Sequence, residues 1–276
     1  MNSKSTAKSP VAQSIEVWRG EDLPGVELFG GTSVTRKVPP HWHSEFQFCL
    51  ITGGGGDLLY KGVRHRTNAG SMFAMHPGEV HANETEFEEG CTYRTLNISP
   101  GVIEHLDPVG RGLAFSLKPV IEDADVIEAF LACSAGIENG VSRLAIDSLL
   151  LESVTGLVDR YGWKPSPSRH SFAANVWVVR DYLIDNYSQN VSLKMLAEIA
   201  GLSPFHLVRS FRDRVGIPPH KFQICVRLER SKDLLRKRWL IANVAAECGF
   251  ADQSHYIRSF KRVVGVTPTI YRDSQL

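Results

Sequence analysis

Side chains that can bind ligands or metals alternate with apolar ones over a short stretch of the N-terminal half. The polar set occupies odd-numbered positions: His41, His43, Glu45 and Gln47. The apolar set occupies even-numbered positions: Trp42, Phe46, Phe48 and Leu50. Because successive side chains of a β-strand point to opposite faces, this alternation predicts one strand with an apolar face toward a core and a polar face toward a cavity. Such polar groups can bind a small molecule or a divalent transition metal.

A second segment with a histidine follows about thirty residues later. Gly70 comes first, and the turn Pro77-Gly78 leads to His81. Together with the earlier His-x-His, this order makes residues 39–83 resemble the two sequence motifs of the cupin proteins. The resemblance implies a small β-barrel with a polar mouth.

In metal-binding cupins, three histidines and one acid hold the metal. By position these ligands correspond to His41, His43, Gln47 and His81. Glutamine is a poor anionic ligand, although Glu45 has the same strand parity, so we expect a metal-free pocket and no cofactor. The predicted effector pocket consists of His41, His43, Glu45, Gln47 and His81. Two alternatives remain, which are metal-assisted binding and histidines that only make local hydrogen bonds. An anionic effector could also contact Arg36, Arg64, Arg66 or Arg94.

The C-terminal hundred residues contain a second chemical pattern, and it occurs twice. Arg209-Ser210-Phe211 recurs as Arg258-Ser259-Phe260, 49 positions later. Gly201 precedes the first tripeptide and Gly249 the second, each between segments with helical spacing of apolar residues. A helix, a turn and a second helix that enters the major groove form a common DNA-reading unit. The duplication therefore predicts contact with two adjacent segments of one duplex.

Helical spacing separates the buried and exposed sides of each reading helix, the second helix of each unit. Leu207 with Phe211, and Tyr256 with Phe260, are i, i+4 pairs expected in the core. The predicted base-reading residues are Phe205, His206, Arg209, Gln253, Ser254, His255 and Arg258. Phosphate contacts, which orient a protein without reading sequence, are predicted for Arg212, Lys221, Lys261, Arg262 and Arg272.

Residues 173–272 resemble the DNA-binding domain of the AraC-type transcription regulators. The resemblance rests on Cys248-Gly249-Phe250, Ser254-His255-Tyr256, residues 258–262, Thr267-Pro268 and Tyr271-Arg272. It implies two helix–turn–helix units joined by a long helix, an N-terminal regulatory domain that is often a cupin-type barrel, and activation of transcription. It also implies a base contact at Val208, where this chain departs from the usual polar residue.

The chain is predicted to be an α+β multidomain protein, with a cupin-type β-barrel followed by helices and then an all-α domain. The predicted segments are a disordered tail (1–14), a cupin-like regulatory and dimerisation domain (15–161), a linker (162–171) and the double helix–turn–helix domain (172–276). Within the barrel, Gly53–Gly56 is predicted to be a hairpin turn. Helices are predicted at 122–134 and 141–161.

The net charge of the 276-residue chain is +1, but it is unevenly distributed. Residues 1–169 carry 15 Lys and Arg against 21 Asp and Glu, a net of −6, and residues 170–276 hold the remaining 16 and 9, a net of +7. A basic half suits DNA binding, and an acidic half suits a separate sensing domain. The scattered cysteines and the lack of an apolar leader or span predict a cytoplasmic protein without a membrane partner.

These patterns predict a sequence-specific transcription regulator controlled by a small-molecule effector in the barrel. We do not expect an enzyme, because no nucleophile–base or acid pair is indicated by spacing. The expected partners are double-stranded promoter DNA, the effector, a second copy of the chain and RNA polymerase. Two alternatives are a constitutive DNA-binding protein with a purely structural barrel and a cupin metalloenzyme.

Overall fold

The computed structural model describes residues 13–20, 23–85, 90–106, 120–161 and 174–274. The predicted tail and linker lie almost entirely outside these residues, although Ser14 already begins the first strand. In the part of the chain that is described, no helix is both long and apolar enough to cross a membrane.

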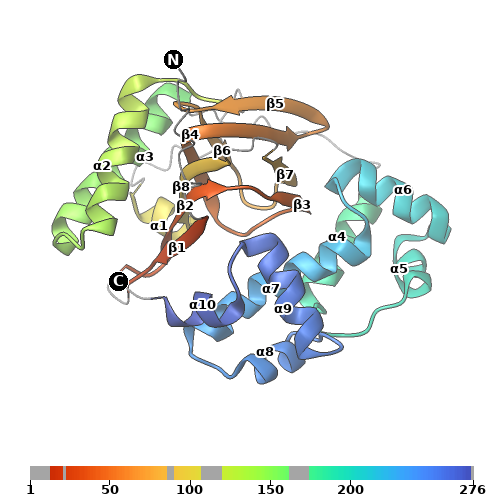
Figure 1. The fold of residues 1–276 in the computed structure, drawn as a ribbon. Helices are drawn as coiled ribbons and strands as arrows, with labels where there is room; N and C mark the ends of the chain where they lie inside the picture. The colour runs from red at the N-terminus through yellow and green to blue at the C-terminus, as the bar shows by residue number, and fades with distance from the viewer. Residues whose placement is uncertain (1–12, 21–22, 86–89, 107–119, 162–173, 275–276) are drawn as a thin grey trace, which may run out of the picture.

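Eight antiparallel strands form the curled sheet of the N-terminal domain (Figure 1). They are β1 (Ser14–Trp18), β2 (Val26–Val34), β3 (Lys37–His41), β4 (Phe46–Tyr60), β5 (Val63–Asn68), β6 (Met72–Met75), β7 (His81–Glu84) and β8 (Cys91–Ile98). The hydrogen-bonded order is β1-β2-β8-β4-β7-β3, and β5 and β6 also pair with β4. The sheet curls around β4, because the first half of β4 pairs with β8 and β6 and its second half with β5 and β7.

β4 passes through Gly53–Gly56, so the predicted hairpin turn at this position was wrong. The register of β4 against β8 shifts at the start of the glycine run, and Gly54 has a φ of +67°. A Cβ atom on Gly55 would lie 2.3 Å from the carbonyl oxygen of Thr67. The glycines therefore let one long strand bend between the two halves of the sheet while neighbouring backbones approach closely.

The predicted single strand over residues 41–50 is interrupted, which is a second correction. β3 and β4 are separate strands, and between them the His43 carbonyl accepts a hydrogen bond of 2.9 Å from the Gly78 amide. This bond to a turn replaces the strand ladder, so the alternation of faces does not continue across the break. As a result, Trp42 packs in the core of the C-terminal domain instead of the core of the sheet.

Three helices complete the N-terminal domain: α1 (Pro100–Leu106), α2 (Ala124–Glu138) and α3 (Arg143–Tyr161). The predicted helices correspond to α2 and α3 within a few residues, whereas α1 was not predicted. Both α2 and α3 pack on the sheet through a shared core that includes Phe48, Leu96, Phe130 and Leu150. Figure 1 shows this helical pair on the side of the sheet away from the C-terminal domain.

The C-terminal domain is entirely helical, as predicted. Its helices are α4 (Ala174–Asp185), α5 (Leu193–Ala200), α6 (Pro204–Val215), α7 (Pro219–Arg236), α8 (Ile241–Glu247), α9 (Gln253–Val264) and α10 (Pro268–Asp273). The reading helices α6 and α9 begin with side-chain caps, since Ser203 accepts from the His206 amide and Asp252 from the His255 amide. Both end at a glycine in the left-handed conformation, Gly216 or Gly265.

The core of each helix–turn–helix unit forms as the spacing predicted. Leu207, Phe211, Tyr256 and Phe260 have no exposed side-chain surface. α7 joins the two units, and both α7 and α9 contact β3. The DNA-binding domain therefore packs directly against one edge of the sheet (Figure 1).

Candidate functional site

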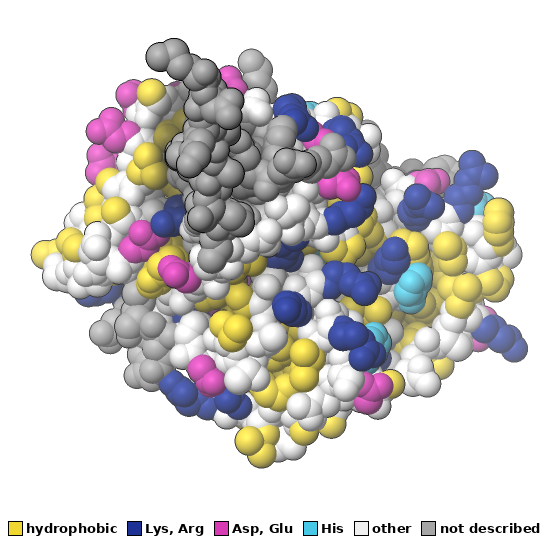
Figure 2. All heavy atoms as spheres, in the orientation of Figure 1, with side chains coloured by type: hydrophobic (Ala, Val, Ile, Leu, Met, Phe, Trp, Pro, Cys, Tyr) yellow, Lys and Arg dark blue, Asp and Glu magenta, His cyan; other side chains and the backbone are white. Residues whose placement is uncertain are grey.

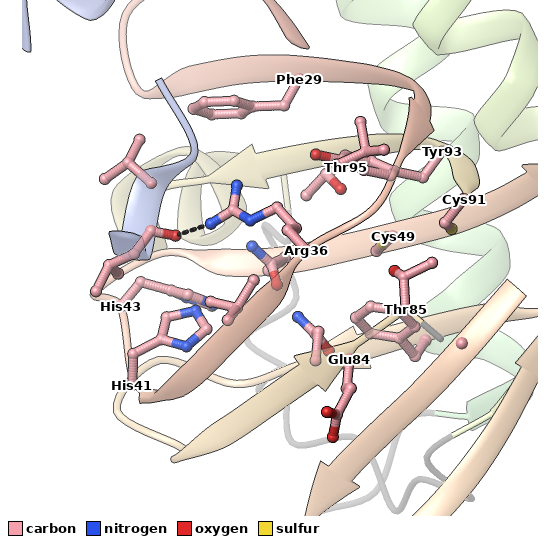
Figure 3. A pocket seen from close by; sticks show the side chains of 18 of the residues that line it. Phe29, Arg36, His41, His43, Cys49, Glu84, Thr85, Cys91, Tyr93 and Thr95 are labelled. Carbon is pink, nitrogen blue, oxygen red and sulfur yellow. Dashed lines mark hydrogen bonds between the residues drawn. The ribbon is translucent and has the colours of Figure 1, made fainter. Parts of the chain in front are cut away.

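A cavity of about 140 Å³ lies inside the curled sheet, close to the C-terminal domain. Three predicted pocket residues border it, namely Gln47 and the two histidines His41 and His43, which are labelled in Figure 3. Apolar and weakly polar side chains form much of the remaining wall: Phe29, Ile51, Phe73 and Tyr93. A concave surface with this mixture of apolar walls and a few polar groups is typical of small-molecule sites.

The DNA-binding domain supplies part of the same cavity wall. Glu229 and Lys232 reach it from α7, and Val263 and Val264 reach it from the last turn of α9. Arg36, which also borders the cavity (Figure 3), donates hydrogen bonds to the carbonyl oxygens of Arg262 (2.9 Å) and Val263 (3.1 Å). A cation at the C-terminal end of a helix is favourable, so Arg36 ties the second reading helix to the barrel.

His81 joins His41 and His43 in a buried cluster beside the cavity. The centroid of the His81 ring lies 4.4 Å from that of His41 and 4.9 Å from that of His43. His81 does not border the cavity itself and instead lines a neighbouring groove with Trp42 and Phe222. His81 was predicted to share the effector pocket with His41 and His43, and in the structure it lies behind them, beside the cavity.

All three histidines have the same orientation. The Nδ1–H groups donate to backbone carbonyls, from His41 to Pro39 (2.9 Å), from His43 to Glu45 (3.0 Å) and from His81 to Glu79 (3.1 Å). Each Nε2 atom therefore carries a free lone pair. Among the described residues, the buried Nε2 atoms of His43 and His81 have no hydrogen-bond partner.

Burial keeps this histidine cluster neutral. It lowers the pKa of His41 to about 3, and the neighbouring His43 acts in the same direction. Burial likewise lowers the pKa values of His43 and His81. Neutral imidazoles are metal ligands, and the candidate ligand atoms of the three side chains lie within 4.8 Å of one another. The donor set therefore fits a transition metal, and these are the described residues that could hold one.

Glu45 does not take part in the predicted pocket, which is a third correction. Because the strand is interrupted before it, its carboxylate faces α7, where Lys232 Nζ lies 3.6 Å from Oε2 and Arg236 Nη2 lies 3.6 Å from Oε1. Burial alone would raise the pKa of Glu45, but the charges around it, led by Lys232, outweigh burial and lower it to about 2. Glu45 therefore connects the domains electrostatically.

Lys232 lies at the centre of a set of charges between the two domains, which is buried except for the exposed Arg236 and which we call the interdomain charge cluster. Its members are Glu27, Glu45, Glu229, Lys232 and Arg236. Lys232 Nζ is 2.8 Å from Glu229 Oε1, and Glu229 Oε2 accepts from the amide (3.1 Å) and hydroxyl (2.9 Å) of Ser44. Burial raises the pKa of Glu229 to about 7, partly offset by Lys232.

Strand β2 of the barrel also contacts the C-terminal end of the DNA-binding domain. Glu27 pairs with Arg236 (3.0 Å) and accepts a hydrogen bond from the buried Tyr271 hydroxyl of α10. Arg19, directly after β1, donates to the carbonyl of Arg272 (2.9 Å). Sequence reasoning missed this contact, since its partners lie more than 200 positions apart.

The predicted DNA-reading residues lie on the surface of α6 and α9. Six of them are exposed and His255 is half-buried; the exposed ones are Phe205, His206, Arg209, Gln253, Ser254 and Arg258. Phe205 is 79% exposed, which is unusual for a large aromatic side chain and suits a partner that stacks or packs on it. Among the described residues Arg209 has a loose ion pair with Asp213 at 4.0 Å, which leaves its guanidinium able to reach a base edge.

The predicted phosphate contacts are less uniform than the base-reading residues. Arg212, Lys221, Lys261 and Arg262 have exposed side chains. Arg272 is half-buried and paired with Asp273 at 2.7 Å. Figure 2 shows Lys and Arg side chains, with histidines among them, over the face that carries α6 and α9. This surface is the candidate nucleic-acid interface.

The four arginines considered for an anionic effector have different surroundings. Arg64 and Arg66 pair with Asp57 at 2.7 and 3.2 Å, and Arg94 pairs with Glu138. Of the four, Arg36 is the one that borders the cavity.

The curled sheet with its cavity and the duplicated helix–turn–helix domain define a ligand-binding transcription regulator. Two family models match the chain: "AraC-like ligand binding domain" over residues 23–154 and "Helix-turn-helix domain" over residues 196–274. The chain belongs to the AraC family of transcription regulators.

Curated relatives agree with this assignment, and a solved structure shares the fold. YbfI of Bacillus subtilis, an uncharacterized HTH-type transcriptional regulator, is 27% identical over 83% of this chain and 85% of its own length. The transcriptional activator RhaS of Pectobacterium carotovorum is 23% identical over 91% of this chain and 96% of its own. A crystal structure of ToxT from Vibrio cholerae has a TM-score of 0.54 and 14% identity, covering 94% of this chain and 97% of that one, which shows the fold.

The cavity residues from α7 and α9 were not predicted. Glu229 and Lys232 form an i, i+3 pair of opposite charges on a helix whose neighbouring positions Cys225, Leu228 and Leu235 are buried. That pattern was a usable signal, because an ion pair on a buried helix face requires further polar partners. No comparable signal marks Val263 and Val264, whose side chains fit any partly buried helix end.

Proposed function

We propose that this protein is a transcriptional activator in which a small-molecule effector in the barrel cavity controls the docking of the DNA-binding domain. The observation that carries the proposal is the shared wall of the cavity, since Glu229, Lys232, Val263 and Val264 come from the DNA-binding domain. An effector can change DNA binding only if it favours one arrangement of the two domains over another. A ligand that touches both domains meets this requirement directly.

The size of the cavity supports the same mechanism. A space of about 140 Å³ is smaller than the roughly 300–1,000 Å³ of usual ligand pockets. An effector of ordinary metabolite size therefore extends beyond this space, and displacing Val263 and Val264 or the hydrogen bonds of Arg36 to the end of α9 is one way to make room for it. Such a displacement would free the second reading helix from the barrel.

The remaining partners follow from surfaces and relatives. Promoter DNA binds α6 and α9 through the predicted base-reading residues. Large apolar side chains exposed on α2, on α3 and in the turn between them favour a homodimer: Leu131, Val141, Leu144 and Leu151. The activator RhaS supports activation, in which a DNA-bound dimer contacts RNA polymerase. ToxT of Vibrio cholerae has been solved with an unsaturated fatty acid bound, which supports an effector with both apolar and polar parts here.

The test begins with a thermal-shift screen of the full chain against metabolites, because a ligand of the folded state raises Tm. A ligand found in this way is then added to fluorescence-anisotropy titrations with promoter DNA. Control by the cavity predicts a changed affinity for DNA, and cavity-lining variants such as Ile51→Trp should lose the response. Unchanged DNA affinity with the ligand bound would favour a constitutive regulator with a structural barrel.

A further inference from the structure

The histidine cluster has an arrangement that is costly without a common partner. His41, His43 and His81 are 6%, 5% and 1% exposed, and their rings meet within 4.4 to 6.0 Å of one another. Burying a polar atom without a hydrogen bond costs free energy, and the Nε2 atoms of His43 and His81 have none among the described residues. Three neutral imidazoles also cannot satisfy one another, because each Nδ1–H group is already used.

We propose that His41, His43 and His81 bind one divalent transition-metal ion of the zinc class through their Nε2 atoms. The backbone carbonyls that accept from Nδ1 provide the outer partners that metal-bound histidines usually have, since such partners fix the tautomer and orient the ring. Imidazole donors select zinc, copper, iron or nickel, whereas magnesium and calcium require oxygen donors.

The carboxylate that would accompany three histidines is missing from this set. Gln47 donates its amide to Asn97 at 3.2 Å, and Glu45 faces Lys232 in the interdomain charge cluster. Three protein nitrogens leave at least one position of a metal open. Because His41 and His43 also border the cavity, water or an oxygen atom of the effector completes the coordination.

Trp42 connects the site to the core of the DNA-binding domain. Trp42, which lies between two of the ligands in sequence, stacks on Phe222 of α7 with a centroid distance of 5.2 Å and an interplanar angle of 22°. Phe222 in turn meets Phe211 of the first reading helix at 5.6 Å. An ion that fixes the two flanking histidines therefore also fixes Trp42 and stabilises the first helix–turn–helix unit on the barrel. This coupling rests on the proposed function, whereas the metal site does not.

The metal site is tested with Zn²⁺ on the chelator-treated full chain by isothermal titration calorimetry. We expect one equivalent to bind, with a rise in Tm. His81→Gln should lower the affinity by at least the roughly 10–100-fold that loss of an outer-shell partner costs, and the exposed-histidine control His105→Gln should not. Equal Zn²⁺ affinity for wild type and a folded His81→Gln would overturn the site, because it would place the ion on surface histidines.

A second measurement covers the case in which His81→Gln does not fold. Co²⁺ bound to wild type should give the intense visible absorption of a four-coordinate nitrogen-rich site, and the weak spectrum of a six-coordinate aqueous ion would overturn the proposal. Coupling is measured separately by hydrogen exchange, where Zn²⁺ should slow exchange in α6 and α7. If Zn²⁺ binds but does not slow exchange in α6 and α7, the coupling is refuted and the metal site is not. The result of this experiment does not depend on whether an effector controls DNA binding.

Discussion

Replacing Lys232 with methionine should release the two domains from each other. The Lys232 side chain is 6% exposed, and its ammonium lies 2.8 Å from Glu229 and 3.6 Å from Glu45. Methionine keeps most of the volume but removes the lysine that pairs with Glu229 and leaves Glu45 with Arg236 as its remaining cation among the described residues. Removing one partner of a buried ion pair costs about 3–5 kcal/mol, which lowers the docking equilibrium constant by roughly 10²- to 10⁴-fold.

The pH should change the size of this effect. With Lys232 gone, Glu229 can take up a proton, because burial already raises its pKa. We therefore expect the free-energy cost of Lys232→Met to be about 3 kcal/mol at about pH 6 and about 5 kcal/mol at about pH 8.

The assay is hydrogen exchange at the Ser44 amide, which donates to Glu229 in the docked arrangement, combined with urea unfolding of the full chain. Lys232→Met should speed exchange at Ser44 and lower the urea midpoint. The matched control is Lys221→Met, an exposed lysine of the same helix, which should do neither. Wild-type exchange at Ser44 in Lys232→Met would refute the argument that this ion pair holds the domains together.

Three further predictions concern the reading helices, the charge cluster and the end of α9. Arg258→Ala should cost about 1–3 kcal/mol at one base pair and relax specificity there, whereas Lys261→Ala should weaken all sequences alike; binding to single-base operator variants distinguishes them. The folded pKa of Glu229, about 7, lies above its ordinary 4.5. Its stability contribution is therefore complete below about pH 4.5 and lost as pH rises through about 7, so Glu229→Gln should flatten the unfolding free energy over that window. Arg36→Ala should speed hydrogen exchange in the last turn of α9; an unchanged rate would mean that the barrel does not restrain this helix.

The DNA-binding domain could be predicted from sequence because its signals are local. Ser203-Pro204 and Asp252 at helix starts, and Gly216 and Gly265 at helix ends, fix the two reading helices within a few residues. The same logic could have found α10, which was missed, since Thr267-Pro268 repeats the cap followed by proline.

The barrel site could be predicted only in part. His41 and His43 were correctly placed beside a cavity, but period-two alternation failed after them because the chain turns to pair with the segment around Gly78. The direction of Glu45 depends on Lys232, nearly two hundred positions away, and no periodicity encodes such a contact. The wall that the DNA-binding domain contributes to the cavity was unpredictable for the same reason.

The most direct test of the account is the affinity of the full chain for promoter DNA with and without a ligand that binds the cavity. Fluorescence anisotropy should give dissociation constants that differ by about 5–150-fold, the usual range of coupling between two sites. The difference should disappear in Lys232→Met, in which the domains no longer share the cavity wall. Equal affinities for wild type with the ligand bound in the cavity would contradict the claim that the barrel controls DNA binding.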